Sequence, residues 1–110
     1  MLYLNDNEDR AVRAFTAQLK KDLKKNLKDI KLFGSKSTGR YGENSDIDVL
    51  LIVKTRDESV LDIVSEILMD VELEFNARIS PVVLTIEEFN KDIECNTSFY
   101  LDILREGVSI

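Results

Sequence analysis

The fold is decided by Leu32-Phe33-Gly34-Ser35 and, after ten further residues, by Asp46-Ile47-Asp48-Val49-Leu50-Leu51-Ile52-Val53. The apolar residues Ile30–Phe33 predict one strand. Ile47–Val53 predicts a second, and its continuous apolar run is typical of a strand buried on both faces. Side chains alternate between faces along a strand, so we expect Asp46 and Asp48 on the same side, about 7 Å apart. Two carboxylates on one rigid strand can bind one or two hard cations.

A glycine-serine turn precedes the aspartates and adds a second chemical element to this segment. Gly34 allows the backbone to approach a ligand closely, and Ser35 adds a hydroxyl and an N–H group that can donate to phosphate oxygens. Lys36 carries a positive charge that would neutralise phosphate. A cation site beside a phosphate cradle supplies the parts that phosphoryl or nucleotidyl transfer needs.

Each of these residues also has a purely structural interpretation. Ser35 and Asp46 are common turn residues, and Lys36 fits an ordinary solvated surface. Asp48 is harder to explain in that way, because a carboxylate inside an otherwise apolar strand is costly unless it is paired, solvated or bound to metal. The interval between the glycine-serine pair and the two aspartates therefore favours the metal interpretation.

The segment Gly34–Asp48 resembles the signature of the DNA polymerase beta-like nucleotidyltransferase superfamily, and most of all its minimal nucleotidyltransferases, or MNT proteins. The resemblance includes the ten-residue interval, Gly39, Ser45 and an ending of the type Phe99–Val108. It implies a nucleotidyltransferase fold in which Asp46 and Asp48 hold Mg²⁺ or Mn²⁺. It also implies that Gly34, Ser35 and Lys36 bind the phosphates of a nucleoside triphosphate. Asp46, Asp48 and Ser35 would be the catalytic residues.

The same resemblance implies a substrate and a partner. MNT proteins often act as antitoxins beside a helical HEPN toxin, and some transfer AMP from ATP to a tyrosine hydroxyl of that toxin. The resemblance therefore implies a HEPN-domain protein as partner and acceptor. The alternative is a catalytically degenerate module that binds a nucleotide or the HEPN protein and neutralises its partner by complex formation.

A third carboxylate usually follows on the next strand in active members of this superfamily, where it completes the metal site and can act as a general base. The corresponding run Ile79–Leu84 contains no acid. Alternation along that run places Ser80 and Val82 best for such a role. Three acids outside the strand are further candidates: Glu72, Glu74 and Glu87.

The composition narrows the chemistry. The chain has no histidine, so histidine-based acid–base catalysis within it is excluded and any metal would be held by oxygen ligands. Cys95 is the only cysteine, which excludes an intrachain disulfide. The net charge of −6 argues against direct nucleic-acid binding. The charge is uneven, because residues 41–110 carry sixteen Asp and Glu residues against five Lys and Arg residues.

The length of 110 residues predicts a single domain, residues 1–110. No apolar run approaches the roughly 20 residues of a membrane span, and the first residues do not resemble a signal peptide. We therefore expect a cytoplasmic protein without membrane contact. The sequence leaves its oligomeric state open.

Apolar spacing predicts the remaining elements. Four helices are expected. The first runs from about residue 7 to 27, and the second runs from a capping box at Thr55 and Glu58 to about residue 75. A short third helix follows a second box at Thr85 and Glu88, and the last covers about residues 98–106. Asn5 and Glu8 form another candidate box. Ile79–Leu84 is the third strand, at an edge because it contains Pro81. A compact loop joins the first two strands, so we expect an α/β (α+β) fold with a small mixed sheet of about three strands packed with helices.

Overall fold

The computed structural model describes residues 6–33, 46–94 and 108–109 of the chain. Within these ranges it contains the helices α1 (Asp6–Leu23), α3 (Glu58–Phe75) and α4 (Ile86–Glu94), and the 3₁₀ turn η1 (Lys24–Asn26). The strands are β1 (Leu27–Phe33), β2 (Ile47–Val53), β3 (Ile79–Thr85) and the short β4 (Val108–Ser109). They form one sheet in the order β3-β2-β1-β4. The fold class is confirmed, with β4 as a short addition to the predicted strands.

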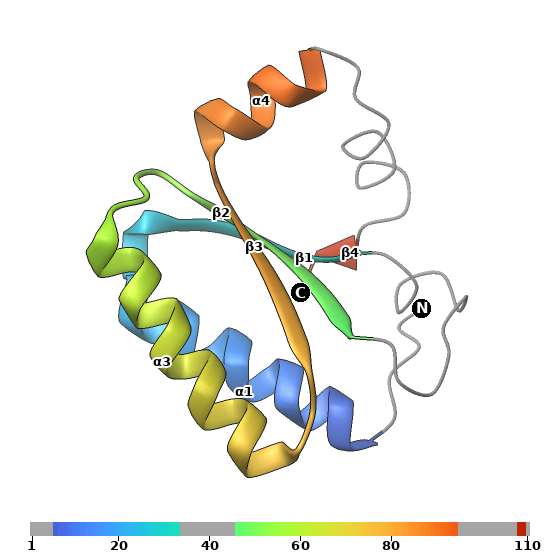
Figure 1. The fold of residues 1–110 in the computed structure, drawn as a ribbon. Coiled ribbons are helices and arrows are strands. Elements are labelled where there is room, and N and C mark those ends of the chain that lie inside the picture. Colours follow the sequence, from blue (N-terminus) through green and yellow to red (C-terminus); the bar gives the residue numbers. More distant parts are fainter. Residues whose placement is uncertain (1–5, 34–45, 95–107, 110) are drawn as a thin grey trace.

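The sheet is mixed and the helices cover it unequally. β1 pairs antiparallel with β2, while β2 pairs parallel with β3, and α3 makes the crossover between them. Figure 1 shows α1 and α3 side by side on one face and α4 on the other. A large cluster of buried residues fills the space under α1 and α3, and a smaller one lies under α4 around Leu50, Ile52 and Phe89.

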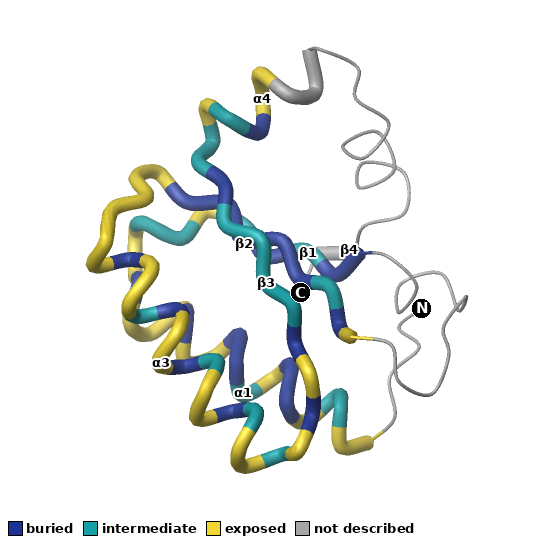
Figure 2. Tube along the Cα trace, viewed as in Figure 1, coloured by how far each residue is buried: buried dark blue, intermediate teal, exposed yellow. Residues whose placement is uncertain are grey.

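β2 is the centre of the core. All of its residues except Asp48 are buried, and Figure 2 shows this burial along the strand. Its odd-numbered residues pack under α1 and α3, and its even-numbered residues Leu50 and Ile52 pack under α4. The predicted bounds of this strand, and its burial on both faces, are confirmed. The edge position of β3 is confirmed as well.

The first helix ends earlier than its apolar spacing predicts. α1 stops at Leu23 because Lys24 takes a left-handed conformation with φ 52°, and β1 then begins at Leu27 instead of Ile30. Leu27 follows Leu23 by four residues, which suits a helix, but its side chain packs against the core equally well from a strand. Asn26 fixes this turn, because its side chain bonds the backbone N–H and C=O of Thr55 at 2.9 and 3.0 Å.

One of the predicted capping boxes is confirmed and another is wrong. The Thr85 hydroxyl accepts from the Glu88 N–H at 3.1 Å, and the Glu88 carboxylate accepts from the Thr85 N–H at 3.0 Å. At α3 the cap is Asp57, which accepts from the Val60 N–H at 3.0 Å, so Thr55 and Glu58 form no box. A carboxylate directly before the first turn is a stronger acceptor than the hydroxyl two residues earlier.

Several predictions fall outside the described residues. These are the cap at Asn5, the turn with Gly34, Ser35 and Lys36, the last helix at about 98–106 and the environment of Cys95. In the described part of the chain, no helix has the length and apolar character that a membrane crossing requires.

We predict that Lys24→Gly raises the free energy of unfolding by about 0.5–1 kcal/mol. A left-handed conformation costs a residue with a Cβ about 1–2 kcal/mol, and the greater backbone freedom of glycine in the unfolded chain offsets part of that gain. Urea denaturation measures the change. Lys24→Ala keeps the Cβ and should leave stability within error of the wild type. A Lys24→Gly variant less stable than Lys24→Ala would contradict the prediction.

Candidate functional site

The two aspartates lie at the beginning of β2. Asp48 is the second residue of the strand and is half-buried, whereas Asp46 lies just before it and is exposed. The neighbours Ile47 and Val49 point into the core under α1 and α3. Alternation therefore directs the Asp48 side chain to the opposite face, the one that α4 covers further along the strand at Leu50. The prediction that Asp48 and Ile47 project to opposite faces of the strand agrees with this burial pattern.

Pairing within the sheet gives Asp48 two lateral neighbours. Phe33, the last residue of β1, is its antiparallel partner, and Ser80 of β3 is its parallel partner. Side chains in register on adjacent strands share a face, so Asp48 stands between a buried aromatic ring and a hydroxyl group. The sequence analysis identified Ser80 but missed Phe33. The signal for Phe33 was its position at the end of the strand that precedes the glycine-serine turn.

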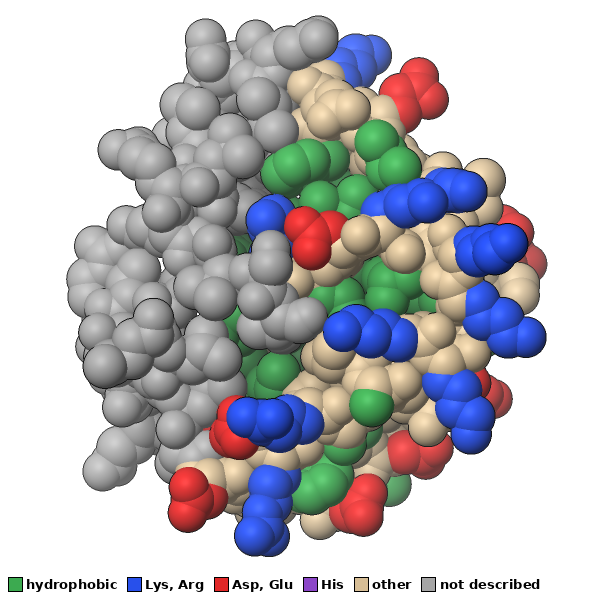
Figure 3. Space-filling model, turned by 180° about the vertical axis from the view of Figure 1, so that it is seen from behind, with side chains coloured by type: hydrophobic (Ala, Val, Ile, Leu, Met, Phe, Trp, Pro, Cys, Tyr) green, Lys and Arg blue, Asp and Glu red, His purple; other side chains and the backbone are tan. Residues whose placement is uncertain are grey.

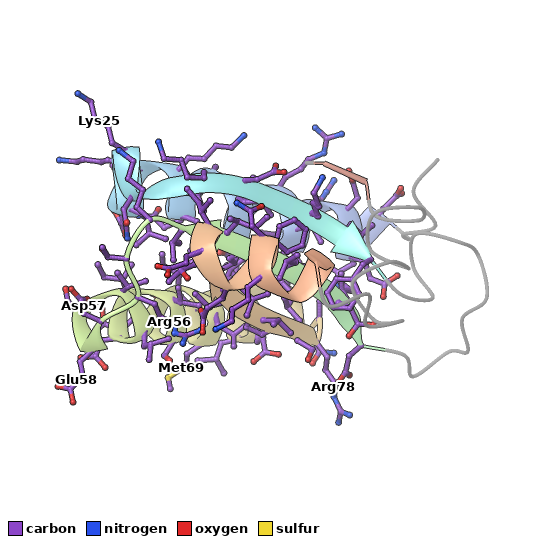
Figure 4. The ribbon with its side chains drawn as sticks, turned by 90° about the horizontal axis from the view of Figure 1, so that it is seen from above. Lys25, Arg56, Asp57, Glu58, Met69 and Arg78 are labelled. Carbon is purple, nitrogen blue, oxygen red and sulfur yellow. The ribbon has the colours of Figure 1, made fainter. Side chains whose placement is uncertain are left out.

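Backbone hydrogen bonds fix the position of the aspartates. The Ile47 N–H, between the two aspartates, donates to the carbonyl of Arg78 at 2.9 Å. Ile79, which follows Arg78 in the chain, donates its N–H to the Glu72 carboxylate at 3.1 Å. The Arg78 side chain points away from the body of the molecule in Figure 4, so its carbonyl alone contributes here. The beginning of β2 is therefore tied to the beginning of β3 before any ligand binds.

The electrostatics of Asp48 suit a cation. Burial raises the pKa of the Asp48 carboxyl above its ordinary value, and the negative charge of Asp46 raises that pKa further. Both effects reflect an ionised carboxylate that has lost water and faces a second carboxylate. A divalent cation bound by both carboxylates would replace the lost hydration of Asp48 and neutralise the repulsion between the two groups. The donor set, two carboxylates at the start of one strand with a hydroxyl beside Asp48, fits Mg²⁺ or Mn²⁺.

None of the three further acids provides the third carboxylate in this structure. Glu72 is engaged with the Ile79 N–H, and Glu74 lies exposed on α3, which covers the opposite face of the sheet. Glu87 follows β3 at the end where Thr85 pairs with Val53, about five residues and roughly 17 Å from Asp48. The parts of the chain that the structure describes contain no group of three acidic, histidine or cysteine ligands.

Ser80 therefore stands where alternation places the missing acid. Val82, the other position from the sequence analysis, pairs with Leu50 and packs into the cluster under α4, so it lies one step further from the aspartates. Gly34, Ser35 and Lys36 lie outside the described residues. β1 ends at Phe33, beside Asp48, so the chain leaves the first strand at the aspartate end of the sheet.

Comparison with known proteins gives a consistent result. Residues 16–108 match the model of the nucleotidyltransferase domain family. Two proteins of Methanocaldococcus jannaschii, both named as candidate protein adenylyltransferases, are similar to most of the chain. The first is 37% identical over 92% of this chain and 95% of its own length. The second is 32% identical over 84% of this chain and 92% of its own length.

Two solved structures share the fold. A chain of a toxin-antitoxin crystallised with AMP-PNP superposes with a TM-score of 0.55 at 22% identity, over 86% of this chain and 68% of that one. A chain of a mutant toxin-antitoxin MntA-HpeT gives the same TM-score of 0.55 and identity of 22%, over 96% of this chain and 72% of its own.

We predict that Asp48→Asn stabilises the metal-free protein at pH 7. The folded state holds the Asp48 proton more tightly than the unfolded chain, so stability falls as pH rises from the ordinary carboxyl pKa, about 4, through the raised one. Removing the charge should raise the free energy of unfolding by about 0.5–1 kcal/mol, since water still screens a half-exposed group. Denaturation in EDTA at pH 7 and at pH 3 measures it.

Asp46→Asn is the matched comparison for this prediction. This substitution removes the charge of Asp46, the smaller cause of the raised pKa of Asp48, and leaves the burial of Asp48 unchanged. Its increase in the free energy of unfolding at pH 7 should therefore be smaller than that of Asp48→Asn. Both increases in the free energy of unfolding should vanish at pH 3, where Asp48 is protonated in the folded and in the unfolded state. An Asp48→Asn protein that is less stable than the wild type at pH 7 in EDTA would contradict the argument.

Proposed function

The chain belongs to the nucleotidyltransferase domain family, and we propose that it transfers AMP from Mg²⁺·ATP to a hydroxyl group of a partner protein. The observation that supports this most is the pair Asp46 and Asp48, anchored at the start of the central strand with the pKa of Asp48 raised. The names of the two archaeal relatives support protein as the acceptor. ATP as substrate agrees with our expectation that the protein acts in the cytoplasm.

In the proposed reaction Asp46 and Asp48 would hold the cation, which would help to bind the triphosphate. Bound Mg²⁺ would neutralise charge that develops on the phosphate oxygens. Ser35 and the Gly34 backbone would bind the terminal phosphates, with Lys36 adding a positive charge, as the family resemblance implies. The acceptor oxygen forms a bond to the α-phosphorus and its proton passes to water, the bond from the α-phosphorus to the bridging oxygen breaks, and pyrophosphate leaves.

We further propose that the acceptor is a HEPN toxin and that the chain is its antitoxin. Two solved structures that share its fold are chains of toxin-antitoxin complexes, and one of them was crystallised with AMP-PNP. A tyrosine hydroxyl of the toxin would receive the AMP.

A second candidate function is neutralisation of the partner by complex formation without turnover. It is favoured by one observation: Ser80 occupies the position beside Asp48, and the described residues include no third acid at the site. A site with two carboxylates can still bind Mg²⁺·ATP, and in this case the nucleotide would regulate or stabilise the complex.

We predict that Asp46→Asn/Asp48→Asn weakens the ATP binding that depends on Mg²⁺. The substitutions remove both ligands of the proposed cation, and calorimetric titration of ATP with Mg²⁺ should show at least a tenfold weaker Kd. Asp22→Asn/Glu58→Gln removes the same charge at the opposite end of the sheet, where Leu27 pairs with Val53, and should bind as the wild type does. Equal binding by the wild type and the Asp46/Asp48 variant would exclude the proposed site.

The same two variants separate transfer from neutralisation when they are co-expressed with a HEPN toxin. Loss of protection with intact complex formation supports transfer of AMP, which labelled ATP would detect on the toxin. Protection that survives the loss of both aspartates supports the second function.

We predict that Ser80→Asp strengthens cation binding. The new carboxylate would stand in register with Asp48 on the same face and complete a three-acid site. Without metal the added repulsion should lower the melting temperature, and saturating Mn²⁺ should restore it by a larger increment than in the wild type. Ser80→Asn, of equal size and no charge, should show the wild-type increment. An unchanged increment in Ser80→Asp would show that position 80 does not face the aspartates.

A further inference from the structure

The outer surface of α3 carries an unusual concentration of exposed apolar side chains. In the part of the chain that the structure describes, the large hydrophobic residues classed as exposed are Leu61, Met69 and Leu73, and all three belong to α3. Their exposed fractions are 43%, 63% and 78%. The buried side of the same helix is complete without them, because Val60, Val64, Ile67 and Val71 pack into the main core. These three residues therefore have no role in the core of the described fold.

The exposed residues form an ordered row. Leu61, Ser65, Met69 and Leu73 follow one another at intervals of four, which aligns them along one side of a helix. The Met69 side chain points away from the body of the molecule in Figure 4. Ser65 is the one small member, and shallow depressions lie around it, one of them lined by Ser65, Leu68, Met69, Glu72 and Leu73.

The depression has the geometry of a helix-packing site. Four of its residues stand at positions i, i+3, i+4 and i+7, which is the arrangement that forms a hole for one side chain of a facing helix. A second depression shares Ser65 and Met69 and extends to Glu66 and Asp70. A ridge of apolar side chains spaced at three and four residues would fill these holes, so the shape points to a helix as the occupant.

The charge beside this row is entirely acidic. Glu58, Asp62, Glu66 and Asp70 are exposed and also follow at intervals of four, and α3 contains no Lys or Arg. Like charges four residues apart destabilise a helix by about 0.2–0.5 kcal/mol per pair. Within the described residues none of these four carboxylates forms an ion pair. A partner that brings positive charge to this row would remove a repulsion that the free protein retains.

We propose that the outer face of α3, defined by the apolar row and the acidic row, docks an amphipathic helix of a partner protein whose apolar ridge is flanked by Lys or Arg. The apolar residues supply the buried contact, and the carboxylates select the basic flank and orient the helix. The proposal does not depend on nucleotidyl transfer, because α3 lies across the sheet from the face of Asp48. A helix bound to α3 would leave the aspartates open.

A second copy of the chain fits this face poorly. Two α3 helices related by a twofold axis would bring acidic rows to one interface. Lysines lie elsewhere, among them those in the last turn of α1 and in η1, and Figure 3 shows several Lys and Arg side chains on the back of the molecule. A contact between that basic region and α3 of another copy would be head-to-tail, and such contacts close only into rings or continue as filaments. A different protein is the better occupant.

The test uses a synthetic amphipathic helix with leucine on one face and lysine beside it, labelled for fluorescence anisotropy, and a counterpart with glutamate in place of lysine. The full chain should bind the lysine peptide, more weakly as salt increases, and should not bind the glutamate peptide. Met69→Ser/Leu73→Ser should weaken binding at least tenfold. Because both side chains are exposed, the variant should keep the wild-type melting temperature.

Neutralisation of the acidic row tests its role, and removal of equal charge elsewhere is the matched control. Asp62→Asn/Glu66→Gln/Asp70→Asn should weaken binding and flatten its salt dependence. Asp6→Asn/Asp22→Asn/Glu87→Gln removes equal charge from exposed positions on α1 and α4 and should leave binding unchanged. No binding of the lysine peptide, equal loss in both triple variants, or binding of the glutamate peptide would overturn the proposal. Light scattering gives a further outcome that would overturn the proposal. If the wild type is a dimer and Met69→Ser/Leu73→Ser is a monomer, a second copy of the chain occupies the face.

Discussion

The structure depends on one constraint, which is that β2 must be buried on both faces and still carry a half-buried carboxylate as its second residue, with an exposed carboxylate just before the strand. Its odd-numbered residues need α1 and α3, and its even-numbered residues need α4. The strand therefore has to lie inside the sheet, with β1 on one side and β3 on the other. That position fixes the neighbours of Asp48, because the register that buries Val49 and Leu51 also places Phe33 and Ser80 beside it. The core and the candidate site thus have a single cause.

The sequence predicts this part of the fold well because its signals are local and agree with one another. The run Ile47–Val53 has no competing helical interpretation, and its bounds are correct. The box at Thr85 and Glu88 is formed as predicted, because no better acceptor lies near that helix start. Where two local signals compete, the prediction is wrong. Asp57 displaced Thr55 as the cap of α3, and Leu27 fitted both a helical and an extended pattern until the left-handed Lys24 ended α1.

The candidate site could be predicted only in part, for a physical reason. Alternation along a strand places Asp48 and Ser80 from sequence, since it needs no knowledge of the rest of the fold. The partner of Asp48 on β1 depends on the register across the hairpin, which spacing alone does not determine. The distance of Glu87 from the aspartates likewise requires the direction of β3, and its parallel pairing with β2 takes Glu87 to the far end of the sheet. Gly34, Ser35 and Lys36 remain predictions from the family resemblance.

Unfavourable electrostatic interactions lie on both sides of the sheet, and the two sets are independent of each other. On one face, burial and Asp46 keep an ionised Asp48 at a disadvantage that a cation would remove. Across the sheet, the acidic row of α3 keeps a repulsion that a basic helix would remove. Both costs lower the stability of the free chain and both would be relieved by binding, so each favours the bound state by the amount it destabilises the free one. Because the sheet lies between them, relief of one does not require or prevent relief of the other. A partner helix could therefore be held on α3 while a nucleotide occupies the aspartate end of the sheet.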